Sequence, residues 1–106
     1  MSIKLTESAV EQVRKSAEEG GMQNLSLRIA AQRRPDGSIE YAMGYDEQND
    51  ADTTREYDGF VLVVAPQSID LLSGAILDYV TMDDGQQQFI FLNPNDPGYI
   101  PPLEHQ

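Results

Sequence analysis

The chain has 106 residues, a length that supports one domain with a modest hydrophobic core. Eighteen acidic residues against seven basic ones give a net charge of −11, which disfavours binding to nucleic acid or to anionic membranes. Cysteine is absent, so disulfides, thiolate metal ligands and cysteine nucleophiles are excluded. No apolar run approaches the roughly 20 residues of a membrane span, and the N-terminus lacks a signal-peptide core, so we expect a cytoplasmic protein.

The N-terminal segment has the pattern of an amphipathic helix. Thr6 is a suitable N-cap, Glu7 complements the helix dipole, and Gly20-Gly21 ends the segment. We expect this helix to cover a sheet, because its apolar residues recur at helical spacing. These residues are Ala9, Val10, Val13 and Ala17.

The middle of the chain predicts a long hairpin. Apolar and polar residues alternate over 25–32 and again over 39–45, as in two half-buried strands. Between them, Arg34-Pro35-Asp36-Gly37 has the residues of a tight turn. The acidic segment 46–52 follows. We interpret it as a flexible loop, since Ala51 stands where an EF-hand calcium loop requires glycine.

The second half predicts a buried strand, a short helix and another hairpin. Residues 60–64 are apolar throughout, and Pro66 opens the helix, where its missing N–H matters least. Aromatic and β-branched residues flank the turn Asp83-Asp84-Gly85, and Pro94 stops the last strand because it cannot donate to a β-ladder. The residues expected to carry much of the buried area are Phe60, Val61, Val63, Leu72, Ile76, Phe89 and Phe91.

The sequence contains no evident catalytic constellation. A histidine-based triad would require an ordered tail, because His105, the single histidine, is the second residue from the end. The paired carboxylates Asp83 and Asp84 lie in a turn, where such groups are usually solvated. We therefore expect a protein that is not an enzyme.

Several segments, in order and spacing, resemble the A-type iron–sulfur carrier (HesB-like) family from about Ile3 to Asn95. They are LTESAVEQVRK, LRIAA, YDGFVLVVAPQSIDLLSGAILDYV and FIFLNPN. The resemblance implies an α+β fold, with twisted mixed β-sheets in a distorted sandwich and a few helices. It also implies a carrier-like domain over residues 1–95, followed by a flexible C-terminal tail over residues 96–106.

The family binds iron or a cluster through three cysteines, one in a turn after the first long strand and two in a Cys-Gly-Cys near the C-terminus. Placing these motifs on the chain puts the three positions at Asp36, Ile100 and Pro102. Iron–sulfur clusters are held by soft thiolates, and isoleucine and proline supply no ligand. The resemblance therefore implies a lost cluster site and no cofactor. Asp36 alone could provide one hard oxygen ligand.

The chain is also similar to cysteine-free relatives of this carrier that are encoded with the dissimilatory sulfite reductase (Dsr) system of sulfur-oxidising bacteria. This implies an accessory or regulatory binding role in sulfur oxidation, with a protein partner. The expected partner surface lies where the cluster would sit. Its residues are Arg33, Arg34, Tyr99 and Ile100.

The sequence leaves open whether the chain binds a metal ion and what its tail does, and it predicts an oligomeric state. The chain could be a residual carrier of iron or another divalent cation, bound by Asp36 and the acidic loop through carboxylates. The C-terminal tail could order on the partner, or could be a frayed end without function. The high negative charge, with no cluster to bridge subunits, predicts a monomer.

Overall fold

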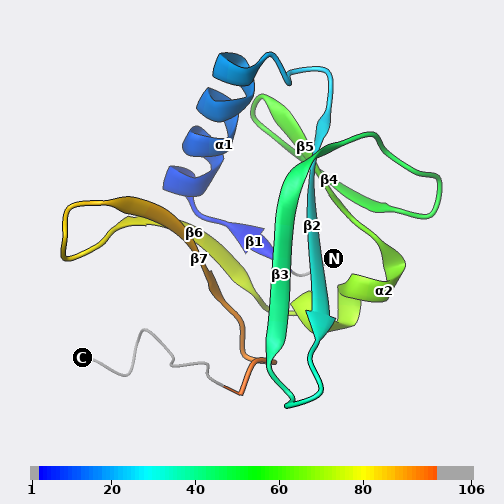
Figure 1. Cartoon of the computed structure of the whole chain (residues 1–106). Helices are drawn as coiled ribbons and strands as arrows, with labels where there is room; N and C mark the ends of the chain where they lie inside the picture. The colour runs from blue at the N-terminus through cyan, green and yellow to red at the C-terminus, as the bar shows by residue number, and fades with distance from the viewer. Residues whose placement is uncertain (1–2, 98–106) are drawn as a thin grey trace.

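The computed structural model describes residues 3–97, which form a mixed α+β fold (Figure 1). One sheet has the strand order β1-β6-β7 and the other β3-β2-β5-β4, and each mixes parallel with antiparallel pairs. The predicted fold class is confirmed. The elements are β1 (Lys4–Leu5), α1 (Glu7–Gly20), β2 (Ser26–Arg33), β3 (Ile39–Asp46), β4 (Thr53–Tyr57), β5 (Phe60–Val64), α2 (Pro66–Ile69), the 3-10 helix η1 (Asp70–Leu72), β6 (Ile76–Thr81) and β7 (Gln87–Leu92).

Helix α1 begins and ends where the sequence predicts. The Thr6 side chain accepts a hydrogen bond from the Ala9 amide at 3.2 Å, which satisfies one of the free amides of the first turn. Gly21 ends the helix in the left-handed conformation, φ 70°, and its amide bonds the carbonyls of Ala17 and Glu18. The apolar stripe of α1 packs toward β6, as expected for a helix that covers a sheet.

The four-stranded sheet is built on the predicted long hairpin of β2 and β3. Its register runs from Ser26 opposite Asp46 to Arg33 opposite Ile39, and the Arg34 amide bonds the Ser38 carbonyl at 2.7 Å. Strand β5 joins β2 in parallel, and β4 pairs antiparallel with β5 at the far edge. Strand β4 is absent from the sequence-based prediction because this edge strand is polar and largely exposed, without the alternation that marks a buried face.

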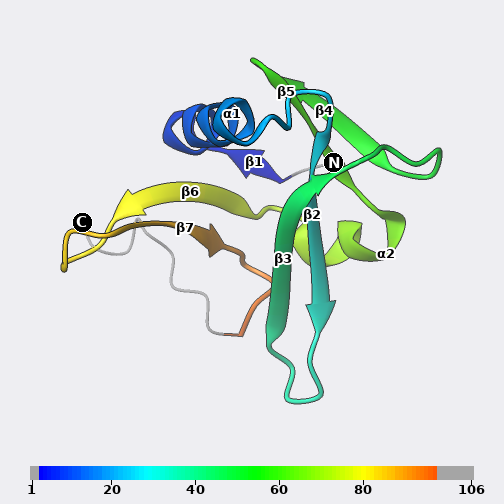
Figure 2. The same cartoon turned by 45° about the horizontal axis from the view of Figure 1, so that its top comes forward.

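The three-stranded sheet contains the second predicted hairpin, β6–β7, and this hairpin extends away from the rest of the described chain in both views (Figures 1 and 2). Its turn closes with a bond from the Met82 amide to the Gln86 carbonyl at 2.6 Å. Strand β1 joins β6 in parallel through only two residues, too few for a periodic signal in the sequence.

The core lies between the two sheets and under α1. The largest fully buried hydrophobic side chains are Ile3, Val13, Ile29, Leu62, Val63, Val64, Leu72 and Leu77. Of the predicted core residues, Phe60, Val63 and Leu72 are indeed buried. Phe89 and Phe91 are partly buried and pack against this core from the edge strand β7. Val61 and Ile76 are also only partly buried, and they lie outside the core cluster.

Candidate interaction surface

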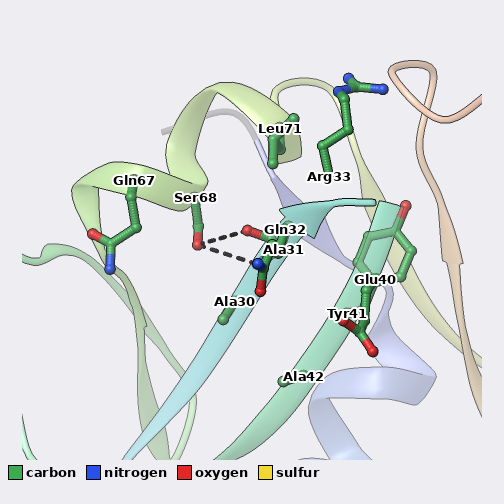
Figure 3. A pocket seen from close by; sticks show the side chains of 10 residues that line it. All are labelled: Ala30, Ala31, Gln32, Arg33, Glu40, Tyr41, Ala42, Gln67, Ser68 and Leu71. Atoms are coloured by element: carbon green, nitrogen blue, oxygen red, sulfur yellow. Dashed lines mark hydrogen bonds between the residues drawn. The ribbon is translucent and has the colours of Figure 1, made fainter. Parts of the chain in front are cut away.

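A surface pocket of about 560 Å³ lies between the tip-proximal half of the β2–β3 hairpin and helix α2 (Figure 3). The two strands form its floor, and α2 with η1 forms one wall. Most of the lining is apolar or uncharged, and Arg33 and Glu40 are its charged residues. The lining residues are Ala30, Ala31, Gln32, Arg33, Glu40, Tyr41, Ala42, Gln67, Ser68 and Leu71.

The wall of the pocket is fixed to the floor by Ser68. Its hydroxyl accepts from the Ala31 amide at 3.1 Å and donates to the Ala31 carbonyl at 3.3 Å, and both residues are buried. Burying a hydroxyl costs little free energy when it both donates and accepts a hydrogen bond, and the two bonds fix the position of the groups that they join. Helix α2 is therefore held directly on β2, and the pocket is a preformed hollow rather than a gap between loose segments.

The hairpin tip beside the pocket carries three of the residues singled out from the sequence. Arg33 donates to the Gly37 carbonyl at 2.6 Å, and Arg34 forms an exposed ion pair with Glu40 at 3.4 Å. Asp36 accepts from the Ser38 hydroxyl at 2.6 Å and from the Ser38 amide at 3.0 Å. These bonds to Ser38 lower the pKa of Asp36. One of its two carboxylate oxygens is therefore already committed within its own turn.

The C-terminal end of the described chain lies at the same end of the molecule (Figures 1 and 2). The Tyr41 hydroxyl donates to the Asp96 carboxylate at 3.3 Å, and the Tyr41 ring stacks on Phe91. Partial burial raises the pKa of Tyr41, and the Asp96 charge acts in the same direction. The phenol therefore stays protonated and remains a hydrogen-bond donor at neutral pH.

Two asparagines of the FLNPN segment hold this end in place. Asn93, which is buried, donates to the Leu71 carbonyl at 2.7 Å, and Asn95 donates to the same carbonyl at 3.2 Å. Asn95 also donates to the Ser73 carbonyl at 2.8 Å, and its amide bonds the Asn93 side chain. The segment therefore fastens the end of β7 to η1, one residue of which, Leu71, lines the pocket. The motif has a structural function here that the sequence alone did not reveal.

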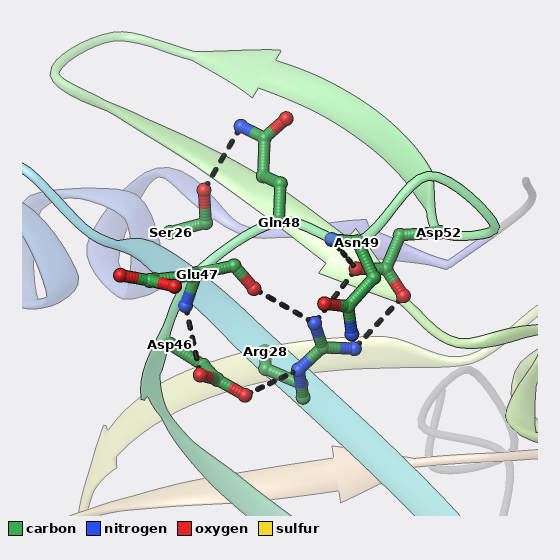
Figure 4. Close-up of polar contacts among 7 residues, drawn as sticks. All are labelled: Ser26, Arg28, Asp46, Glu47, Gln48, Asn49 and Asp52. Carbon is green, nitrogen blue, oxygen red and sulfur yellow. Dashed lines mark hydrogen bonds and ion pairs between the residues drawn. The ribbon is translucent and has the colours of Figure 1, made fainter.

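The acidic loop lies at the other end of the β2–β3 hairpin, where Arg28 binds it (Figure 4). Arg28 contacts Asp46 at 2.9 Å, the Asp52 carboxylate with two nitrogens at 2.7 and 2.9 Å, and the Glu47 carbonyl at 2.9 Å. The Asp52 side chain is only 1% exposed. Hydrogen bonding to Arg28 lowers the pKa of Asp52 to about 2 and raises the pKa of Arg28 in turn. The segment interpreted as a flexible loop is thus anchored by a charge-assisted network.

The structure describes only part of the predicted partner surface and of the replaced ligand positions. Arg33, Arg34 and Asp36 lie at the hairpin tip, whereas Tyr99, Ile100 and Pro102 lie outside the described residues. Asp36 and the acidic loop are at opposite ends of a hairpin on the order of 25 Å long, so they do not form one cation site. Within residues 3–97, no group of three His, Asp or Glu side chains is arranged to hold a metal ion.

The pocket itself escaped prediction from the sequence. Its floor is formed by small residues, Ala30 opposite Ala42, which carry no chemical signal in a sequence. The alternation of β2 and β3 could have shown that these alanines share the outward face, but not that α2 would leave a hollow above them.

Comparison with known proteins finds relatives that are named for iron–sulfur clusters. The chain is 37% identical over 95 residues to the iron-sulfur cluster insertion protein ErpA 2 of Methylococcus capsulatus, covering 89% of this chain and 72% of that protein. The crystal structure of Escherichia coli SufA, involved in biosynthesis of iron-sulfur clusters, superposes with a TM-score of 0.71 at 23% identity, over 90% of this chain and 88% of SufA. The crystal structure of IscA with the [2Fe-2S] cluster gives 0.66 at 25% identity, over 87% and 82%.

These similarities define the class as an iron–sulfur carrier fold. The chain belongs to the HesB/IscA/SufA/ErpA-type family of iron–sulfur carriers. No protein-family model matches the sequence. Among residues 3–97 there is no helix with the length and apolar character needed to cross a bilayer.

Proposed function

We propose that this member of the carrier family has lost its cluster and acts as an accessory or regulatory binding protein in bacterial sulfur oxidation. The observation that carries the proposal is the absence of cysteine from a chain that otherwise retains the carrier fold. Structural relatives include IscA with a [2Fe-2S] cluster, and clusters of this kind are held by thiolates. Without thiolates, the retained fold offers a surface rather than a cofactor site.

The carboxylate at the first replaced position also supports the loss. Asp36 is exposed, and its Oδ1 atom binds Ser38, so the residue acts as the side-chain cap of its own turn. A single hard oxygen ligand on a turn is a poor substitute for three thiolates. The alternative, a residual carrier of iron or another divalent cation, remains the competing hypothesis that the experiments below test.

The pocket and Arg33 together provide a means of recognising a partner. A volume of about 560 Å³ is ample for an apolar side chain of a partner protein. Within the described chain, Arg33 bonds only the Gly37 carbonyl and forms no ion pair, so most of its donors remain available. We therefore place an acidic or carbonyl-rich contact of the partner beside the pocket, with Tyr99 and Ile100 as further contacts that follow Pro97 in the chain.

Anaerobic reconstitution with iron and sulfide tests the loss of the cluster. The expected result is no stoichiometric visible chromophore on the purified protein, with the ErpA 2 relative as the positive control. A chromophore bound at one cluster per monomer or per dimer would refute the proposal. Sedimentation in the same buffer tests the expected monomer, and a concentration-independent dimer would contradict that part.

The binding role is tested by filling the pocket in a sulfur-oxidising host. Ala42→Phe places a ring on the pocket floor at an exposed position, and Ala51→Phe makes the same change on the distant acidic loop. We expect Ala42→Phe to slow sulfur oxidation to the level of a deletion strain while Ala51→Phe leaves the rate unchanged. Equal rates in both variants and the wild type, with normal protein levels, would exclude the pocket from the function.

A further inference from the structure

The outer face of the β6–β7 hairpin is aliphatic and is not part of the core. Strand pairing puts Ile76 opposite Leu92, Asp78 opposite Ile90 and Val80 opposite Gln88, all on the same face. The Asp78 carboxylate on this face accepts hydrogen bonds from the Thr6 and Ser8 hydroxyls, so four of the six side chains of the face are aliphatic. The aliphatic side chains are half-buried, and they are absent from the residues that pack against the hydrophobic core. A sheet face with this composition normally packs on something, and within residues 3–97 its aliphatic side chains lie outside the hydrophobic core cluster.

Strand β7 is also an open edge of its sheet within the described chain. The hydrogen bond from the Met82 amide to the Gln86 carbonyl, at 2.6 Å, shows which opposite residues of β6 and β7 are hydrogen-bonded pairs, because these alternate with non-bonded pairs along an antiparallel ladder. By that alternation, the backbone groups of Gln88, Ile90 and Leu92 face β6. Those of the residues between them face outward and are free to pair with another strand. The outward-facing residues are Gln87, Phe89 and Phe91.

A small hollow next to this edge extends the apolar surface. It has a volume of about 210 Å³, and both Phe89 of β7 and Met43 of β3 line it. Met43 is among the exposed large hydrophobic residues, at 36%. A strand added to β7 would therefore find aliphatic side chains on one of its faces and an apolar hollow on the other.

The hairpin and the chain that follows it carry charge of one sign. Residues 76–97 contain four aspartates and no lysine or arginine. Asp83 and Asp84 lie in the exposed hairpin turn beside β7, whereas Lys4, a basic residue of this sheet, is in β1 at its opposite edge. A strand with basic residues at its ends would complement this field, and an acidic strand would be repelled.

We propose that the open edge of β7, together with the aliphatic face of the hairpin, binds a basic, strand-forming segment of another protein. The segment adds an antiparallel or parallel strand to β1-β6-β7, and its lysines or arginines contact the aspartates of the turn. This surface is distinct from the pocket at the β2–β3 hairpin, so the inference is independent of the proposed function.

The test uses the full chain, labelled with nitrogen-15, and a nine-residue probe peptide with a Val/Ile/Thr centre and two lysines at each end. Two matched peptides replace every lysine by glutamate, or the central residue by proline. We expect the lysine peptide to bind at least ten-fold more tightly than either control at low salt. We also expect amide exchange at the outward-facing positions Gln87, Phe89 and Phe91 to slow at least ten-fold, since strand addition bonds alternate amides.

Two charge-matched variants locate the site. Ile90→Lys introduces a positive charge on the aliphatic face and should weaken binding at least ten-fold, whereas Gln67→Lys adds the same charge at the distant pocket and should not. If the lysine peptide shifts only the amide signals of residues 46–58, or if the proline peptide binds equally well, the binding depends on charge alone and the proposal is overturned. A dimer that Ile90→Lys abolishes would make a second copy the occupant. If Ile100→Ser alone, without any peptide, changes the chemical shifts of the β7 amides, the occupant of this edge is the C-terminal segment of the same chain.

Discussion

The ring of Tyr41 lies parallel to the ring of Phe91, with the centroids 4.2 Å apart and 3° between the ring planes. Tyr41 belongs to β3 of the four-stranded sheet and Phe91 to β7 of the three-stranded sheet, so the stacked pair joins the two sheets. Because Tyr41 also lines the pocket and bonds Asp96, this contact sets the position of the candidate surface relative to the end of β7.

A double-mutant cycle measures the contribution of this stack. Phe91→Ala should destabilise the protein by less than the ~3–5 kcal/mol of a fully buried phenylalanine, because Phe91 is half-buried. Combined with Tyr41→Ala, the urea-derived free energies should give a coupling of about 0.5–1.5 kcal/mol. Tyr45→Ala in the same strand is the control and should be additive with Phe91→Ala. Additive effects for Tyr41 as well would show that the stack contributes nothing.

Removing the buried side-chain amide of Asn93 should lower the free energy of unfolding. Asn93→Ala leaves the partly buried Leu71 carbonyl with only its longer bond to Asn95, and the expected cost is about 1–3 kcal/mol. Asn24→Ala makes the same change at an exposed position and should alter the urea midpoint little. If both variants unfold at the wild-type urea midpoint, the Asn93 bond does not stabilise the attachment of β7 to η1.

The Arg28–Asp52 pair predicts a specific loss of stability in acid. The pKa of Asp52 is about 2 in the folded chain and ordinarily 3.8, so its contribution is complete above about pH 4 and disappears as the pH falls toward 2. Urea midpoints between pH 6 and pH 2 should fall less steeply for Asp52→Asn than for the wild type. Asp50→Asn, in the same loop but exposed, should follow the wild type. Parallel curves for all three proteins would contradict the predicted linkage.

Divalent cations should bind weakly and without a dedicated site at the hairpin tip. The Ser38 bonds already occupy one oxygen of Asp36, and among residues 3–97 no group of three His, Asp or Glu side chains is arranged to hold a metal ion. Titration calorimetry with Fe²⁺ and Mn²⁺ should show no saturation at micromolar concentration, for the wild type and for Asp36→Ala alike. Tight iron binding that Asp36→Ala abolishes would instead support the residual carrier.

The sequence predicted those elements whose signals are local. Thr6 and Gly21 mark the ends of α1, and the turns at Asp36 and Gly85 mark both long hairpins. Strand β4 and the two-residue β1 could not be predicted, because each is defined by a partner strand distant in the chain rather than by its own pattern.

The candidate site was only partly predictable for a similar reason. Arg33 and Arg34 stand out as a basic pair in an acidic sequence, and Arg33 does line the pocket. The hollow itself depends on small side chains, Ala30 and Ala42, and on the distance that Ser68 sets between α2 and β2. Likewise, Phe89 and Phe91 have the composition of core residues, but they lie on the edge strand β7 and are therefore only partly buried.

The two asparagine amides on the Leu71 carbonyl have a mechanical consequence. Leu71 lines the pocket, and its carbonyl oxygen is the atom to which the chain after β7 is fastened. A ligand that shifts Leu71 in the pocket would therefore disturb the hydrogen bonds that hold Asn93 and Asn95. If such a shift changes how the following segment binds a partner, reciprocal linkage makes the partner change the affinity of the pocket by the same factor.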